Sequence, residues 1–337
     1  MKKYIGLLVF VLFAMVNNIS SQSKTGLHII NTFHIASPGG WDYIEVGPVH
    51  NWLYVSHGTQ VNILNKKTGD SIGVIENTTG VHGIAFDIAH SKGFTSNGRL
   101  NTVTVFDMNT NKVLSQIATG QNPDAITYEP FSKKIITCNG RSKNLSIIDP
   151  VENKVTDSVD VGGKPETAVS DDNGKLFVNI EDKNEIVVVD MKTLQVTQHW
   201  SLAPAEGPTG LAFDKLSNRL FAGCDKLLVV MDAKNGTIID KITIGDGCDG
   251  VAFDPATNMI YTSNGEGTLS VIHKDYADRY TLVENIATKQ YARTIALDKE
   301  THLIYLPTAD LEKPDPNQKG RPKMIPGTFQ VLVIGKQ

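Results

Sequence analysis

Short apolar runs that alternate with turn residues recur along almost the whole chain. In the clearest copy, residues 248–254 form one apolar run, residues 255–258 form a turn, and a second run ends at Asn264-Gly265. The same phrase recurs around equivalent apolar positions, which are residues 44, 84, 126, 168, 211, 251 and 295. A period of roughly 40–45 residues with several strands per repeat is typical of the blades of a β-propeller.

Each full repeat contains four strand-like runs, which in the second repeat cover residues 83–87, 93–96, 102–106 and 113–117. The last repeat stops after its third run, residues 329–334, while residues 27–35 form a strand with no repeat in front of it. Pairing these two segments would complete the last blade and remove exposed sheet edges. The sequence therefore predicts an all-β fold, a seven-bladed β-propeller of four-stranded blades closed by its N-terminal strand.

Residues 1–21 are predicted to be a signal peptide, with Lys2 and Lys3 before an apolar segment over residues 5–16. A membrane-spanning helix needs about 20 apolar residues, and this segment is shorter. We therefore expect export to the periplasm or the extracellular space, with no transmembrane segment after cleavage. Residues 22–337 are then one seven-bladed β-propeller domain, which we expect to be a monomer.

Composition narrows the range of partners. The chain has 337 residues and a net charge of −4, so it lacks the basic surface expected of a nucleic-acid-binding protein. Its three cysteines are Cys138, Cys224 and Cys248, an odd number that excludes a complete disulfide framework. Cys224 and Cys248 are expected on the same face of adjacent blades, and the sequence leaves open whether they form a disulfide.

Polar residues recur where the first strand of a blade begins and the second ends, and antiparallel pairing places both points on one face. A concave surface with convergent polar groups is the default location for a ligand. The candidate residues at this channel mouth are Asp42, His57, His82, Asn97, Asp124, Asn139, Glu166, Asp249, Asn264 and Arg293. The alternative is that these groups are simply solvated in a wet channel, and that each Asn-Gly forms a turn.

An insertion at residues 310–327 separates the second and third strands of the last repeat. It should emerge on the face of the channel mouth, where long insertions often contribute to binding. The alternative is that the insertion is only a surface loop next to the strands that close the ring.

The ligand types at the mouth bear on metal binding and catalysis. Carboxylate and amide oxygens would suit calcium, but no contiguous calcium loop is present. We therefore predict no resident cofactor or metal and leave calcium open. There is no GxSxG motif, and nothing in the sequence activates Cys224 or Cys248, so the catalytic residues of an enzyme would be unknown.

The repeats resemble the YVTN-type β-propeller family, the YncE-like exported proteins, across everything after about residue 26. The likeness rests on Pro123-Asp124-Ala125-Ile126, Pro208-Thr209-Gly210-Leu211-Ala212-Phe213-Asp214, Asn218-Arg219-Leu220-Phe221 and Leu145-Ser146-Ile147-Ile148-Asp149. Relatives in this family include surface-layer-like repeat proteins, proteins with the lactonase fold and a periplasmic DNA-binding protein. The resemblance implies an exported propeller and carries no catalytic motif onto this chain.

Two functions follow from these features. The first is a ligand-binding or protein-interaction module of the cell envelope, which takes an unknown small molecule or envelope protein at the channel mouth. The alternative is a lactonase-type hydrolase at the same mouth, in which a metal or a pair such as His82 and Glu166 activates water.

Overall fold

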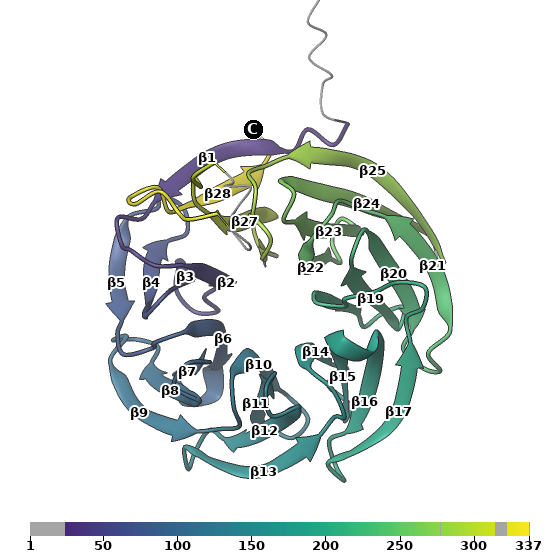
Figure 1. Ribbon diagram of the computed structural model, residues 1–337, viewed down its shortest axis with the longest axis horizontal. Helices are drawn as coiled ribbons and strands as arrows, with labels where there is room; N and C mark the ends of the chain where they lie inside the picture. The colour runs from purple at the N-terminus through teal and green to yellow at the C-terminus, as the bar shows by residue number, and fades with distance from the viewer. Residues whose placement is uncertain (1–23, 277, 314–321, 337) are drawn as a thin grey trace, which may run out of the picture.

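The computed structural model describes residues 24–276, 278–313 and 322–336, and these form a ring of antiparallel sheets around a central channel (Figure 1). The described residues contain 28 strands, arranged as seven four-stranded sheets. The predicted all-β, seven-bladed propeller of four-stranded blades is therefore confirmed. Two short 3-10 helices, Ile88–His90 and Glu181–Lys183, lie in turns.

The blades follow one another around the ring in chain order. Blade 1 consists of β2 (Trp41–Val46), β3 (Trp52–His57), β4 (Gln60–Asn65) and β5 (Ser71–Ile75), and blade 2 of β6 (Val81–Asp87), β7 (Lys92–Asn97), β8 (Thr102–Asp107) and β9 (Val113–Ala118). Blade 3 consists of β10 (Pro123–Glu129), β11 (Lys134–Asn139), β12 (Asn144–Asp149) and β13 (Lys154–Asp160), and blade 4 of β14 (Pro165–Ser170), β15 (Lys175–Ile180), β16 (Glu185–Asp190) and β17 (Gln195–Ser201). Blade 5 consists of β18 (Leu211–Asp214), β19 (Arg219–Cys224), β20 (Leu227–Asp232) and β21 (Ile238–Thr243), and blade 6 of β22 (Cys248–Asp254), β23 (Met259–Asn264), β24 (Thr268–Tyr276) and β25 (Arg279–Ala287). Blade 7 consists of β26 (Ala296–Asp298), β27 (Leu303–Thr308), β28 (Gln330–Gly335) and β1 (His28–His34).

The N-terminal strand β1 is the outermost strand of blade 7. It pairs antiparallel with β28, from His28 opposite Gly335 to His34 opposite Gln330. Phe33 is buried, and its ring lies 6.5 Å from that of Tyr305. One blade thus contains strands from both ends of the chain, and these lie side by side in Figure 1.

Apolar side chains are buried mainly between neighbouring blades. The middle strands of a blade are apolar on both faces, as in β8, where four consecutive residues are buried. Between blades 1 and 2, Tyr54 and Ile63 pack with Ile84 and Phe106, and the rings of Tyr54 and Phe106 lie 5.8 Å apart. Since a blade buries its faces only against its neighbours, the fold depends on an unbroken ring.

Carboxylates near the end of the first strand tie blades together on the face opposite the predicted mouth. Four of these acids contact a donor from the next blade: Glu129 with Ser170, Asp214 with Lys274, Asp254 with His302, and Asp298 with Lys66. Asp214 is 2% exposed and lies 2.5 Å from Lys274. Burial alone would raise the pKa of Asp214, but Lys274 and Ser217 outweigh it and lower that pKa.

Some expectations fall on segments outside the described residues. These include the leader over residues 1–21 and the central part of the insertion, residues 314–321. In the described flanks of the insertion, Leu311 forms an antiparallel bridge with Met324, and Lys289 contacts Asp310 at 2.6 Å. Among the described residues, no helix has the length and apolar character needed to cross a membrane.

Ring closure by β1 can be tested by deletion. A chain lacking residues 22–36 should unfold at a lower temperature or aggregate, because β28 would become an exposed edge and Phe33 would be lost from the core. Removing only residues up to 23, which leaves β1 intact, provides the control. Thermal melting with size-exclusion chromatography measures both effects, and a shortened chain that stays monomeric with unchanged melting would contradict the role of β1.

The inter-blade acids predict a second effect on stability. Lys274→Met leaves the buried Asp214 carboxylate without its cation, which should cost up to about 3 kcal/mol in the free energy of unfolding. Lys215→Met is the matched control, because Lys215 and its partner Asp172 are both exposed. Urea denaturation of both variants measures the difference, and equal losses would show that the buried pair has no special role.

Candidate functional site

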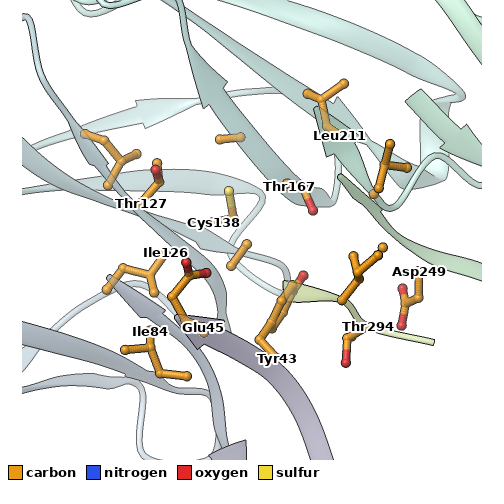
Figure 2. Close-up of a pocket in the computed structure, with 18 residues that line it drawn as sticks. Tyr43, Glu45, Ile84, Ile126, Thr127, Cys138, Thr167, Leu211, Asp249 and Thr294 are labelled. Atoms are coloured by element: carbon orange, nitrogen blue, oxygen red, sulfur yellow. The ribbon is translucent and has the colours of Figure 1, made fainter. Parts of the chain in front are cut away.

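The central channel forms a pocket of about 170 Å³ between the innermost strands of the blades. Tyr43 and Glu45 of blade 1, Thr167 of blade 4 and Asp249 of blade 6 line it (Figure 2). The mouth residues predicted from the first strands lie at or just before the beginning of those strands, and one of them, Asp249, lines this pocket. The geometry of those strand beginnings therefore decides which side chains meet.

Five of the first strands carry a β-bulge at the mouth. In β6, Val81 pairs with Asn97 and Ile84 with Thr95, so one extra residue is accommodated around His82. The same shift surrounds Asp42, Asp124, Glu166 and Asp249. Bulges redirect side chains, and this one repeats where the candidate residues lie.

Side chains of preceding blades also hold the mouth residues in place. Thr294 donates to the carbonyl oxygen of Asp42 at 2.6 Å, and Thr209 donates to that of Cys248 at 2.6 Å. Ser96 donates in the same way to the carbonyl oxygen of Asp124. The backbone at the mouth is therefore fixed by contacts that cross from one blade to the next.

Three of the predicted residues form a compact cluster from blades 1, 2 and 3. His82 Nδ1 lies 2.5 Å from Asp42 Oδ2 and 3.6 Å from Asp124 Oδ1. One ligand atom from each of these residues lies within 4.8 Å of the other two. The side chains are partly exposed, at 13% for Asp42, 25% for His82 and 16% for Asp124, so a solute can reach them.

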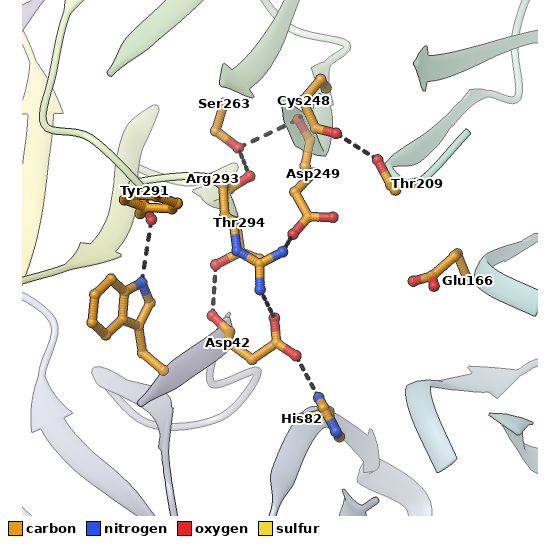
Figure 3. Close-up of polar contacts among 12 residues, drawn as sticks. Asp42, His82, Glu166, Thr209, Cys248, Asp249, Ser263, Tyr291, Arg293 and Thr294 are labelled. Carbon is orange, nitrogen blue, oxygen red and sulfur yellow. Dashed lines mark hydrogen bonds and ion pairs between the residues drawn. The ribbon is translucent and has the colours of Figure 1, made fainter. Parts of the chain in front are cut away.

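Arg293 connects this cluster to blade 6. Its guanidinium forms an ion pair with Asp249 and lies 3.6 Å from Asp42 Oδ1 (Figure 3). Asp42 therefore contacts His82 on one side and Arg293 on the other. The sequence predicted each of these residues at the mouth, and the structure brings them into one connected network.

Glu166 lies in the next blade along the ring and has a cation of its own. Lys164 Nζ lies 2.5 Å from Glu166 Oε1 and also pairs with Glu181. Sequence reasoning missed Lys164 and Glu181. The sequence signal for this pair was the position of Lys164, two residues before the mouth residue Glu166.

Burial and the charges of neighbouring groups shift the pKa values of Asp124, Glu166 and His82. Burial raises the pKa of Asp124 and of Glu166, and each is raised further by a neighbouring carboxylate, Asp42 for Asp124 and Asp124 for Glu166. Burial lowers the pKa of His82, but its hydrogen bond to Asp42 and the charge of Asp124 outweigh this and raise that pKa to about 8. At neutral pH His82 is therefore mainly protonated.

Four predicted residues do not face the mouth. The three amides are fully buried within their blades: Asn97 bonds to Thr95 and Thr104, Asn139 to Thr137 and Ser146, and Asn264 to Thr262 and Ser270. A threonine two residues before each asparagine, on the same face of the strand, was the sequence signal for this internal role. The placement of these amides at the mouth is thus corrected.

His57 is also buried and satisfied. Its ring stacks on Phe329 with centroids 3.8 Å apart, and its nitrogens lie 2.6 Å from Ser37 Oγ and 2.8 Å from the carbonyl oxygen of Gly39. Burial lowers the pKa of His57 to about 4, so the ring stays neutral. His57 therefore belongs to the core next to the β1–β28 pair, and it is not part of the mouth site.

Tyr43 is a functional candidate that sequence reasoning missed. It extends from blade 1 across the channel and packs against the apolar cluster of blades 3 and 4, which includes Ala125 and Ala168. Thr167 hydrogen-bonds to its hydroxyl, and burial raises the pKa of that hydroxyl well above its usual value. Tyr43 is therefore neutral, and it lines the channel pocket between Asp42 and Glu45 along β2.

The residues that converge do not form the oxygen-rich set expected for calcium. Calcium takes about 6–8 oxygen ligands, whereas the amides lie inside the blades and only Asp42 and Asp124 lie beside His82. Two carboxylates and an imidazole are closer to a transition-metal ligand set, although His82 Nδ1 already bonds to Asp42.

The cysteines are unsuited to nucleophilic chemistry. Cys138, Cys224 and Cys248 are free and buried. Burial raises the pKa of Cys224 and of Cys248 to about 12, so neither is a thiolate at neutral pH. The sequence left open whether Cys224 and Cys248 form a disulfide, and in the structure both are free thiols.

The raised carboxyl pKa values at the mouth predict how stability depends on pH. A carboxyl whose pKa is raised in the folded state stabilises the protein below its ordinary pKa and loses that contribution as pH rises through the raised pKa. The double variant Asp124→Asn with Glu166→Gln should therefore match the wild type near about pH 4 and be more stable by about 1–3 kcal/mol near about pH 8. Urea denaturation at both pH values tests this, with Asp157→Asn on the exposed strand β13 as the control. A double variant that is less stable at the higher pH would show that these carboxylates support the fold.

Comparison with known proteins gives the fold only. The structure is similar to that of Kuenenia stuttgartiensis hydrazine synthase, with a TM-score of 0.71 over 81% of this chain and 94% of that chain, at 14% sequence identity. No known protein-family pattern matches this sequence, and no curated protein matches it either. At this identity the likeness supports the β-propeller architecture and leaves the function to be argued from the site.

Proposed function

We propose that this chain is an exported, YVTN-type binding module of the cell envelope, which takes a small cationic ligand at the channel mouth. The observation that carries the proposal is the imbalance of charge around Asp124. Asp42, Asp124 and Asp249 supply three carboxylates, whereas the network contains two cations, His82 and Arg293. One negative charge remains without a close partner.

That charge lies at Asp124. His82 is its nearest partner in an ion pair, at 3.6 Å, and His82 is committed more closely to Asp42 at 2.5 Å. Arg293 is occupied by Asp249 and Asp42, and Lys164 by Glu166 and Glu181. The cations of the mouth are therefore shared among other acids, and Asp124, which is 16% exposed, has no cation of its own.

An organic ammonium group matches this environment. It supplies one positive charge and three N–H donors, and carboxylates accept such bonds strongly. Bound beside Asp124 and Glu166, it would relieve the repulsion that raises their pKa values. Hydroxyl groups on the same ligand could bond to the remaining carboxylate oxygens of the ring.

The same geometry disfavours the hydrolase alternative. A general base must be deprotonated at the working pH, but Asp42 and Asp124 hold His82 mainly protonated. The other candidate base, Glu166, is engaged by Lys164 at 2.5 Å and is not part of the cluster that His82 forms with Asp42 and Asp124. The pair expected to activate water is thus better suited to binding than to proton abstraction.

Export and partners complete the proposal. The leader predicted over residues 1–21 and the resemblance to YncE-like proteins support a periplasmic or extracellular location. We propose a small molecule as the ligand, with an envelope protein as the alternative partner, and a monomer as the working form. The described flanks of the insertion begin at the mouth-side end of β27.

Matched sugars test the proposed ligand class. Glucosamine and glucose differ by one ammonium group, so glucosamine should raise the melting temperature saturably whereas glucose should not. Asp124→Asn should weaken the glucosamine response by about tenfold or more, the usual cost of losing a charged hydrogen bond. Asp157→Asn should leave the response unchanged.

Ethanolamine and arginine extend the test to other amines of different size. Equal responses to glucosamine and glucose would show that positive charge is not recognised. No saturable response to any of the three amines, or a full response in Asp124→Asn, would contradict the proposed site.

A further inference from the structure

The channel continues from Tyr43 toward the face opposite the mouth. Three positions after each mouth residue, the first strands carry Glu45, Ala85, Thr127, Val169, Ala212, Ala252 and Ala296. Four of these seven are alanines, so little side-chain volume fills the channel at this level. The resulting chamber continues into a vestibule of about 380 Å³, which Tyr128, Phe213 and Phe253 border on the opposite face.

Glu45 is the one charged residue in that ring. Its side chain points into the pocket (Figure 2), whose other walls include Ile84, Ile126 and Leu211. Among the described residues, no side chain donates a hydrogen bond to its carboxylate, which accepts only from the backbone N–H of Val46. The nearest cation that influences it is Lys299 at the rim.

This environment is unfavourable for an isolated carboxylate. Glu45 is exposed to the channel, so water reaches its carboxylate, while the protein around the channel raises its pKa to about 7 although Lys299 opposes the shift. Two buried acids elsewhere in the chain, Asp214 and Asp298, have a cation within 2.8 Å. Among the described residues Glu45 has no such ion pair, so a bound ammonium group would be the first close cation of its carboxylate.

We propose that this chamber is a second binding site, which takes a small primary amine with an apolar ring and holds the ammonium group at Glu45. The volume supports a ring of this size, because an apolar cavity of about 150 Å³ accommodates benzene and the pocket measures about 170 Å³. The apolar walls would cover the ring, and Thr127 lines the same pocket as Glu45.

The chamber adjoins the mouth, because Asp249 of the mouth network also lines its pocket, but Glu45 and Asp124 belong to different levels of the channel. Tyr43 lies between them, anchored by Thr167 and by its packing against blades 3 and 4. The vestibule opens among the turns that follow the first strands, including Pro130 and Lys299, whereas the mouth lies where those strands begin. A ligand of the chamber therefore approaches from the face opposite Asp124.

Calorimetric titration with benzylamine tests the chamber, with benzyl alcohol as the neutral control. Benzylamine should bind the wild type saturably, and benzyl alcohol should bind at least about tenfold more weakly. Glu45→Gln keeps the size of the side chain and removes its charge, so it should weaken benzylamine binding by about tenfold or more. Thermal melting of this variant verifies that it is folded.

Crossing the variants separates the chamber from the mouth. Asp124→Asn should leave benzylamine affinity within about twofold, and Glu45→Gln should leave the glucosamine response of the mouth unchanged. Benzylamine binding that is lost in Asp124→Asn and kept in folded Glu45→Gln would place the amine at the mouth and overturn the proposal. Absence of benzylamine binding to the wild type, or unchanged affinity in Glu45→Gln, would overturn it as well.

Discussion

Closure of the ring is the constraint on which the rest of this structure depends. The middle strands of each blade are buried on both faces, and only the neighbouring blades can cover them. Blade 7 is complete because β1 pairs with β28, so the two ends of the chain are tied into one sheet. The carboxylates that connect successive blades, such as Asp214 with Lys274, add polar links on the face opposite the mouth.

A closed ring has a consequence for chemistry, because it draws side chains from distant parts of the sequence to one axis. Asp42 and Arg293 are 251 positions apart, yet they belong to one network with His82 and Asp249. The repeated β-bulge turns these side chains toward the channel, and hydrogen bonds from preceding blades hold the backbone there. The site is rigid for the same reason that the fold is stable.

Tyr43 divides this axis into two environments. Above it, carboxylates and cations lie close together and largely neutralise one another, with the remaining charge at Asp124. Below it, alanines widen the channel, and Glu45 lies among apolar walls with Lys299 only at the rim. Both compartments carry acids with raised pKa values, but neighbouring carboxylates add to the shift at the mouth, whereas in the chamber burial is the cause.

The period of the apolar pattern determined the architecture by itself, because strand length, turn residues and repeat spacing are local properties of the sequence. The orphan strand at one end and the missing strand at the other likewise identified the segments that pair. Tertiary structure alone decided which polar residues meet. Asp42, His82 and Asp124 converge, whereas Asn97, Asn139 and Asn264 occupy equally regular positions but turn inward to threonine and serine partners. The reason is that a strand-end side chain can face either the channel or the blade interior, and the choice depends on a bulge and on partners from other strands. The role of Tyr43 was hidden for the same reason, since its contacts lie across the channel in blades 3 and 4.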